Sequence, residues 1–317
     1  MKRVFAVVFF ALFSGLVFSQ NYPARAIRLI VPFPPGGSND IVGRMVGQQL
    51  GERLAQSVVI DNRGGAGGTI GTDMAAKATP DGYTLLLISV AHAFNPAMYK
   101  KLPYDPEKAF APIGMVAAGP VALTVHPSVP AQSVKELIAL VKANPGKMNY
   151  ATAGIGSFQH LASELFKLQA GLDMVHIPYK GGGPAMMDTI AGQAQINMAS
   201  LIQVIPHAKS GKLRLLATSG TKRTALFPDV PTVAETVPGY DATNWWGLVA
   251  PAATPQAIVG RLHSELSVVL SSSTTQQRVE NEGAEVVRMT SAEFGRFIAE
   301  ETQKWAKVVK QAGIIAE

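Results

Sequence analysis

The pattern of apolar and polar positions predicts a strand, a turn and a helix near the start of the chain. Residues 28–33 form a short apolar run typical of a buried strand, and residues 34–39, with two prolines and two glycines, interrupt any regular element. From Ile41 to Leu54, apolar residues then recur at steps of three and four, which is the spacing of one helix face. The segment 28–54 is therefore expected to be a βα unit with a glycine-rich turn.

The turn of this unit has the composition of an anion-binding loop. Gly36 and Gly37 have no side chain to keep a ligand away from the backbone, and Ser38 or Asn39 is expected to cap the helix. The N-terminus of a helix carries roughly half a positive charge, so its free N–H groups favour an anion. An ordinary βα turn with a capped helix explains these residues equally well, and the segment alone leaves both interpretations open.

Strands and helices are expected to alternate along the rest of the chain. Apolar runs bounded by turn residues predict strands at 57–61, 83–88, 148–152, 175–179, 196–199, 214–218 and 244–250. Helical spacing and caps predict helices at 69–78, 133–142, around 161–168, up to Ala191, at 255–270 and at 292–311. Strands that alternate with helices pair in parallel, which predicts an α/β fold with its ligand beyond the carboxyl ends of the strands.

Two α/β units, the second inserted into the first, are expected from the order of these elements. Two strand pieces, 115–117 and 121–125, flank a break at Ala118-Gly119-Pro120, where the chain is expected to cross between the units. Residues 20–119 and 245–317 then form a discontinuous first domain, and residues 120–244 form the second. A pair of units joined by two crossings is typical of a hinged binding protein.

The first 19 residues have the layout of a secretory signal peptide. Lys2 and Arg3 precede an unbroken apolar run at residues 4–13, and small residues lead up to Ser19. A membrane span needs about 20 apolar residues, so export and cleavage after Ser19 are expected rather than an anchor. Because the sequence contains no cysteine, neither a lipid anchor nor a disulfide is expected, and the mature protein should be free in the periplasm.

Charge and glycine spacing argue against nucleotide and nucleic-acid partners. Without Lys2 and Arg3 the net charge falls from +6 to +4, and no cluster of Lys and Arg remains to bind nucleic acid. The glycine loops at Gly65, Gly154 and Gly181 all lack the glycine that a dinucleotide fingerprint requires at its sixth position. No P-loop is present either, so no cofactor is expected, and the mild basicity supports only a modest preference for small anions.

An exported enzyme is the alternative function. His160 and Glu164 have the i, i+4 spacing of a metal pair or an acid–base pair on one helix face. Zinc sites use three or four ligands and no third ligand is evident nearby, so no metal site is predicted. The sequence also has no G-x-S-x-G motif and no cysteine nucleophile, so no catalytic residue is assigned.

Several segments of the chain carry a combination of motifs that is specific only when they are taken together. They are Tyr22-Pro23 with residues 27–33, Pro35-Gly36-Gly37 with Asp40, and residues 62–71, 80–86, 154–160, 178–181 and 246–251. Together they resemble the substrate-binding proteins of tripartite tricarboxylate transporters, the Bug or TctC family, over essentially the whole mature chain. Gly64 and Ala253 depart from the family pattern, and neither lies in the predicted anion-binding loop.

The resemblance implies a type II periplasmic binding-protein fold, with two α/β domains, a central cleft and a hinge of two crossings. It implies no catalysis and a small carboxylate ligand, of which one carboxylate group is held between the loops 33–40 and 153–157, partly through ordered waters. A membrane permease or a sensor protein is the implied partner, without a choice between them. The protein is expected to act as a monomer.

The positions that match the family motifs define the candidate ligand site. They are Phe33, Gly36, Gly37, Ser38 and Asp40 in the first loop, Ala153, Gly154, Gly156 and Ser157 in the second, and Ser89, Ala91, Tyr179, Ser200 and Trp246 as further lining positions. Packing or loop roles explain the further positions equally well, and a carboxylate such as Asp40 in a first helical turn simply favours the helix dipole. Neither loop contains arginine, so backbone N–H groups and serine hydroxyls are expected to hold the ligand.

Overall fold

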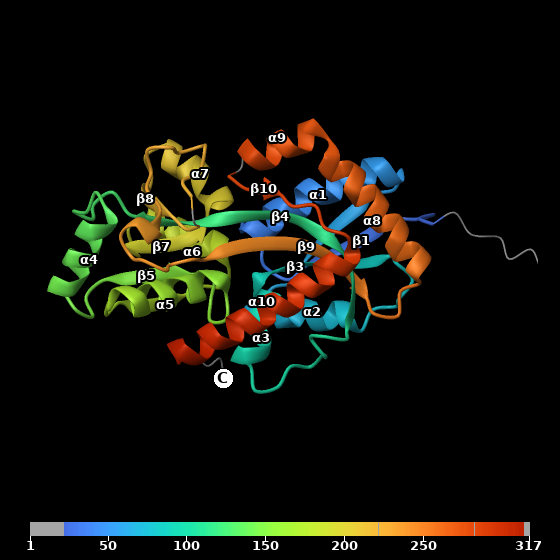
Figure 1. Ribbon diagram of the computed structural model, residues 1–317, viewed down its shortest axis with the longest axis horizontal. Helices are drawn as coiled ribbons and strands as arrows, with labels where there is room; N and C mark the ends of the chain where they lie inside the picture. The colour runs from blue at the N-terminus through green and yellow to red at the C-terminus, as the bar shows by residue number, and fades with distance from the viewer. Residues whose placement is uncertain (1–21, 221, 282, 314–317) are drawn as a thin grey trace, which may run out of the picture.

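The computed structural model describes residues 22–220, 222–281 and 283–313, and the expected leader at residues 1–19 lies outside them. Two groups of helices and strands lie side by side in Figure 1. The right-hand half is built from β1 (Ile27–Val31), α1 (Ser38–Leu54), β2 (Val58–Asn62), η1 (Ala66–Gly68), α2 (Thr69–Ala76), β3 (Thr84–Ser89), α3 (Val90–Met98), α8 (Gln256–Ser271), α9 (Ser273–Asn281) and β10 (Glu285–Val286). The last helix, α10 (Ser291–Ala312), extends from this half toward the left-hand half. The left-hand half is built from α4 (Val134–Ala143), β5 (Asn149–Thr152), α5 (Phe158–Ala170), β6 (Val175–Pro178), α6 (Gly182–Ile190), β7 (Ile196–Ser200), α7 (Leu201–Lys209), β8 (Arg214–Thr218) and η2 (Val233–Glu235).

Two long strands, β4 (Phe110–Val125) and β9 (Thr243–Pro251), run through both halves and join them (Figure 1). The strand order is β2-β1-β3-β9-β4-β7-β5-β6, and β8 and β10 also pair with β4. Within each half the predicted parallel pairing is present, because β1 pairs in parallel with β2 and β3, and β5 with β6 and β7. The connecting strands β4 and β9 are antiparallel to each other and to their neighbours. The α/β prediction is confirmed.

The predicted break at Ala118-Gly119-Pro120 is wrong, because β4 continues through it as one strand of 16 residues. β9 pairs with β4 across these residues, and Gly119 lies opposite Asn244 while Pro120 lies opposite Thr243. The register of this pairing shifts only earlier, between Pro112 and Gly114 and between Met115 and Ala117. A neighbouring strand along this whole stretch supplies the pairing that the local sequence does not favour.

Two helices next to the site, α3 and α7, are absent from the predicted elements. Each begins directly after a strand with no loop between them. The serine that ends the strand stands at the N-cap position of the helix, Ser89 before α3 and Ser200 before α7, and neither side chain makes a capping hydrogen bond. Both helices contain a proline, Pro96 and Pro206, which the local sequence indicates as a helix breaker. Residues 90–92, which follow the predicted strand 83–88 almost directly, are therefore helical.

The C-terminal helix α10 packs against both halves of the molecule. The ring of Trp305 lies with its centroid 6.1 Å from that of Phe94 in α3 and 5.5 Å from that of Phe158 in α5. The buried carboxylate of Glu301 accepts hydrogen bonds from the indole N–H groups of Trp245, at 3.0 Å, and Trp305, at 2.9 Å. Among the described helices, α10 included, none is long and apolar enough to cross a membrane.

Candidate functional site

A small chamber of about 40 Å³ lies between the halves, where the N-termini of five helices meet. Residues from the N-caps and first turns of α1, α3, α5, α6 and α7 line it: Gly37, Ser38, Asn39, Ser89, Ala91, Ser157, Phe158, Gln159, Gly182, Ser200 and Gln203. Phe33, Ala153 and Asn244 complete the lining. The first N–H groups of a helix have no partner within it, so the chamber is surrounded by donors and partial positive charge.

The parallel strands explain why these helix ends meet. β1 and β3 end at the same edge of one half, and β5 and β7 end at the same edge of the other. Each of these strands is followed by a helix, which begins at that edge and directs its N-terminus toward the opposite half. The meeting of the helix N-termini at the chamber follows from the βα order of the chain and from the position of β4 and β9 between the halves.

The polar side chains of the chamber are held by hydrogen bonds behind it. The indole of Trp246 donates to Asn39 Oδ1 at 2.7 Å, and the amide of Asn244 donates to Ser200 Oγ at 2.8 Å. Ser157 Oγ accepts the N–H of His160 at 3.3 Å, which makes it the cap of α5. A serine oxygen that accepts a bond still has its own proton to donate, and no described residue that lines the chamber carries a charge.

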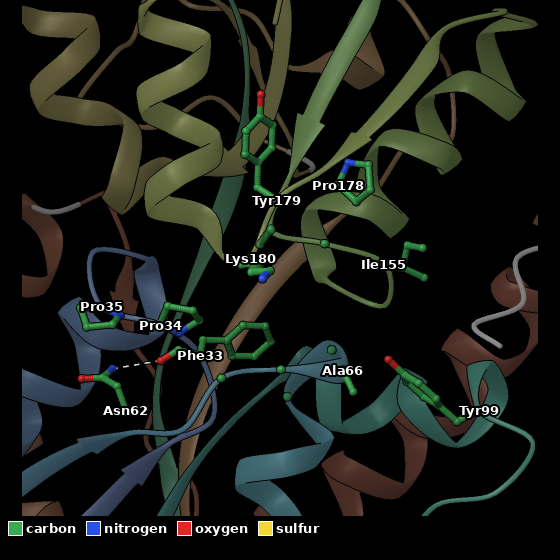
Figure 2. Close-up of a pocket in the computed structure, with 16 residues that line it drawn as sticks. Phe33, Pro34, Pro35, Asn62, Ala66, Tyr99, Ile155, Pro178, Tyr179 and Lys180 are labelled. Carbon is green, nitrogen blue, oxygen red and sulfur yellow. Dashed lines mark hydrogen bonds between the residues drawn. The ribbon is translucent and has the colours of Figure 1, made fainter. Parts of the chain in front are cut away.

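Asp40 supports the first loop from outside the chamber. Its carboxylate accepts the N–H of Gly36 and the amide of Asn62, both at 3.0 Å, and pairs with Arg44 at 3.0 Å. Burial acts to raise the pKa of Asp40, but the hydrogen bonds from Arg44, Gly36 and Asn62 outweigh it and lower that pKa. Asn62 also donates to the carbonyl of Phe33 at 3.0 Å, so the loop is anchored at both ends (Figure 2).

A larger groove of about 950 Å³ opens beside the chamber and shares Phe33 and Ala153 with it. Figure 2 shows its lower wall, formed by the loops of the first half and Tyr99, and its upper wall, formed by residues 153–155 and 178–180. The walls are mainly proline, aromatic and aliphatic side chains and exposed glycine backbone. The groove therefore presents apolar side chains together with exposed backbone N–H and C=O groups.

Glycines allow the two halves to touch on both sides of the chamber. A Cβ atom on Gly67 would lie 2.8 Å from the carbonyl oxygen of Gly156, and one on Gly181 would lie 2.9 Å from Cγ of Pro34. Gly37 faces the backbone of Gly182, with only 3.9 Å between an added Cβ and the amide nitrogen. The halves are in contact around the chamber, as in a closed binding protein.

The family model described as "Tripartite tricarboxylate transporter family receptor" matches residues 42–314. The chain belongs to this family. Protein BugT of Bordetella pertussis is 39% identical over 320 residues, which cover 99% of this chain and 98% of BugT. The family is one of solute-binding proteins rather than enzymes.

Solved structures of receptors in this family have the same fold. "R. palustris Rpa4515 with adipate" is 35% identical with a TM-score of 0.90 and covers 93% of this chain and 99% of that one. "MatC (Rpa3494) from Rhodopseudomonas palustris with bound malate" is 31% identical with a TM-score of 0.86 and covers 91% and 100%. The periplasmic binding protein BugD is 34% identical with a TM-score of 0.90 and covers 93% and 100%. The two-domain periplasmic binding-protein fold that the sequence predicts is confirmed.

The structure brings most of the predicted site residues of the receptor to the chamber or the groove. Phe33, Gly37, Ser38, Ser89, Ala91, Ala153, Ser157 and Ser200 line the chamber, and Gly154 and Tyr179 line the groove. Gly36, Asp40, Gly156 and Trp246 line neither, and they act behind the surface, at the loop or at the contact between the halves. The predicted cap of α1 is wrong, because Gly37 is its N-cap and Ser38 and Asn39 lie inside the helix.

Sequence reasoning missed the side-chain amides of the chamber. Asn39, Gln159, Gln203 and Asn244 all line it, and the last two come from a helix and a strand that carry no recognisable ligand motif. Asn39 and Gln159 could have been predicted from their position in the sequence, because they lie in the first helical turns after the two predicted loops. Gln203 and Asn244 could not be found without α7 and the crossing of β9.

The alternative pair His160 and Glu164 lies on α5 and lines neither cavity. The ring of His160 stacks on that of His176 at 4.2 Å, and Glu164 accepts bonds from the Tyr150 hydroxyl and, at 2.8 Å, from Lys167. Burial lowers the pKa of His160 against the attraction of Glu164. Within the described residues no group of three or more His, Cys, Asp or Glu could hold a metal ion.

Proposed function

We propose that this receptor captures a small carboxylate in the chamber between its halves. The observation that carries the proposal is the meeting of five helix N-termini around a polar, uncharged chamber. Structures of family members described with adipate and with malate support a carboxylate as the ligand class. Each helix end is worth roughly 0.3–2 kcal/mol to an anion, and each hydrogen bond to a charged group roughly 1.5–3 kcal/mol.

The receptor would act outside the cytoplasm without changing its ligand. Cleavage after Ser19 would release it into the periplasm, and the bound acid would pass to a membrane permease or be reported to a sensor. Residues 20–119 with 245–317, and residues 120–244, would move as two domains about β4 and β9. Their boundaries lie opposite each other, since Gly119 pairs with Asn244, which favours a hinge at this point.

Calorimetry on the mature chain tests the proposal, with a panel of mono- and dicarboxylates as probes. Binding at one acid per chain, with the acid recovered unchanged after hours, is expected. Mass spectrometry of the acid released by denaturing protein from its own host should identify the same class. Turnover of the acid that a chelator abolishes would instead favour the metal-enzyme alternative, and the absence of binding by every acid would overturn the proposal.

A further inference from the structure

The second loop of the site begins directly after Thr152, the last residue of β5. Three of its residues line the chamber or the groove: Ala153, Gly154 and Ser157. Thr152 lines neither cavity, and its side chain is fully buried. It is therefore in a position to hold the second loop from behind, as Asp40 holds the first.

Thr152 fixes the backbone of this loop through Gly154. The Thr152 hydroxyl oxygen accepts the N–H of Gly154 at 3.2 Å, and the carbonyl of Gly154 accepts the N–H of Ser157 at 3.1 Å. Gly154 has a φ of 112°, in the region that favours glycine. Because glycine can adopt many backbone conformations, this turn depends on its hydrogen bonds to stay in one of them.

His176 on β6 determines the direction of the Thr152 hydroxyl. Its Nε2 lies 2.6 Å from the hydroxyl oxygen, whereas the carbonyl oxygen of Gly154, the other acceptor near that hydroxyl, lies 3.5 Å away. The shorter contact assigns the Thr152 proton to Nε2, which leaves the oxygen lone pairs to the N–H of Gly154. This arrangement needs a neutral imidazole with its proton on Nδ1, because both ring nitrogens of a protonated histidine are donors.

The surroundings of the His176 imidazole keep it in place and neutral. The ring stacks on Tyr150 of β5, with 5.0 Å between the centroids, and on His160 of α5, with 4.2 Å between them. Burial, with the nearby His160 and Lys167, lowers the pKa of His176 to about 4, against the attraction of Glu164. At neutral pH its Nε2 is therefore an acceptor.

We infer that His176 and Thr152 are positioning residues for the ligand, and that together they hold the second loop in its binding conformation. This inference rests on the proposed function and adds two residues that line neither cavity. The imidazole orients the hydroxyl, the hydroxyl orients the N–H of Gly154, and the turn at Gly154 places Ser157 at the chamber. Asp40 has the corresponding role in the first loop.

Calorimetry on two variants tests this role, with malate, adipate and the acid released from the host's own protein as probes. Thr152→Val removes the hydroxyl, and His176→Phe keeps a stacking ring but removes the acceptor. Each should weaken binding by about tenfold, which corresponds to about 1.4 kcal/mol. The double variant should bind no more weakly than either single one, because both residues act through one chain of hydrogen bonds.

Thr152→Ser and Thr124→Val are the controls. Thr152→Ser keeps the hydroxyl and should retain the affinity of the wild-type receptor. Thr124 on β4 is also fully buried, and its hydroxyl donates to the carbonyl of Asn197 at 3.0 Å, away from the second loop. Thr124→Val should lower the melting temperature as Thr152→Val does and leave the affinity unchanged. NMR of the imidazole nitrogens in the ligand-free receptor should show that Nε2 of His176 carries no proton at neutral pH.

The outcomes distinguish the inference from the function on which it rests. Unchanged affinity in Thr152→Val and His176→Phe, with lowered stability, would mean that the pair only stabilises the fold, while carboxylate binding stands. Additive losses in the double variant, or a proton on Nε2 of His176, would also overturn the inference. If none of the three acids binds to the folded wild-type receptor, the proposed function fails, and the inference fails with it.

Discussion

At the scale of single residues, one side chain can have a structural and a binding role at once. Ser157 is 2% exposed, caps α5 through its oxygen and lines the chamber. Its proton remains available to a ligand oxygen while its lone pair holds the helix. Asp40, in contrast, uses both oxygens within the protein and positions the loop rather than the ligand.

Ser157→Ala should weaken carboxylate binding by about tenfold or more and lower the free energy of unfolding by about 1 kcal/mol. Ser133→Ala is the matched control, because Ser133 also caps a helix, accepting the N–H of Glu136 at 3.2 Å, but does not line the site. Calorimetry and thermal melting should show the same stability loss in both variants and the loss of affinity in Ser157→Ala alone. Unchanged affinity in Ser157→Ala would mean that Ser157 is only a cap.

The stacked histidines His160, on α5, and His176, on β6, predict a dependence of stability on pH. Burial, with the nearby His160 and Lys167, lowers the pKa of His176 to about 4, against the attraction of Glu164. In the unfolded state the pKa of this histidine is about 6.5. As the pH falls, His176 therefore becomes protonated at a lower pH in the folded state than in the unfolded state. The stabilisation is complete above about pH 6.5 and is lost as the pH falls toward 4, by at most about 1.4 kcal/mol per pH unit.

Urea unfolding at several pH values between 7.5 and 4, in roughly half-unit steps, measures this dependence. His176→Gln should show a shallower fall in the free energy of unfolding than the wild type, because one titrating group is removed. Equal slopes in the two proteins would contradict the assignment to His176.

At the scale of elements, the first turns of helices form both the site and the contact between the halves. The N-cap of α1, Gly37, has an extended backbone that any residue can adopt, and it faces the start of α6 at Gly182. A small residue is required here by the approach of the opposite half rather than by the backbone. This makes the position a test of closure.

Gly37→Leu should prevent the halves from closing and lower carboxylate affinity by about tenfold or more, because its branches would enter the space held by Gly182. Gly37→Ala is the control, since an added Cβ lies 3.9 Å from the Gly182 nitrogen, which is ordinary contact. Both variants lose the glycine cap, so any difference between them in calorimetry reports the added bulk. Equal affinities in the two would show that α1 and α6 need not approach this closely.

At the scale of the whole molecule, β4 and β9 are the strands that join the halves, and α10 packs on both. Trp245 and Trp246 are fully buried in β9, and Trp246 donates to Asn39 in the chamber wall. A change in the separation of the halves therefore changes the surroundings of both indoles. The close approach of Gly67 to Gly156 and of Gly37 to Gly182 across the halves shows that this arrangement is closed.

Ligand should shift the molecule toward this closed arrangement. Solution scattering should give a smaller radius of gyration with saturating carboxylate than without it, and tryptophan emission should change over the same concentrations. Gly37→Leu should reduce both responses. A radius that does not change while calorimetry reports saturation would indicate a rigid pocket in place of a hinge.

The sequence by itself determined the local elements and their order. Apolar spacing and turn residues placed most strands and helices, and the cap at Ser133 and the loops at 34–37 and 153–157 lie where they were expected. These features depend on neighbours within a few residues, which the sequence contains directly. The α/β class follows from the same order.

Only the tertiary structure decided which residues share the chamber. Asn39, Gln159, Gln203 and Asn244 come from four different elements, and their meeting depends on how β4 and β9 hold the two halves face to face. The continuous β4 through Gly119 and Pro120, and the helices α3 and α7 despite their prolines, exist because neighbouring strands and helices stabilise them. Contacts between residues far apart in the chain outweigh local preference there, and no local pattern contains them.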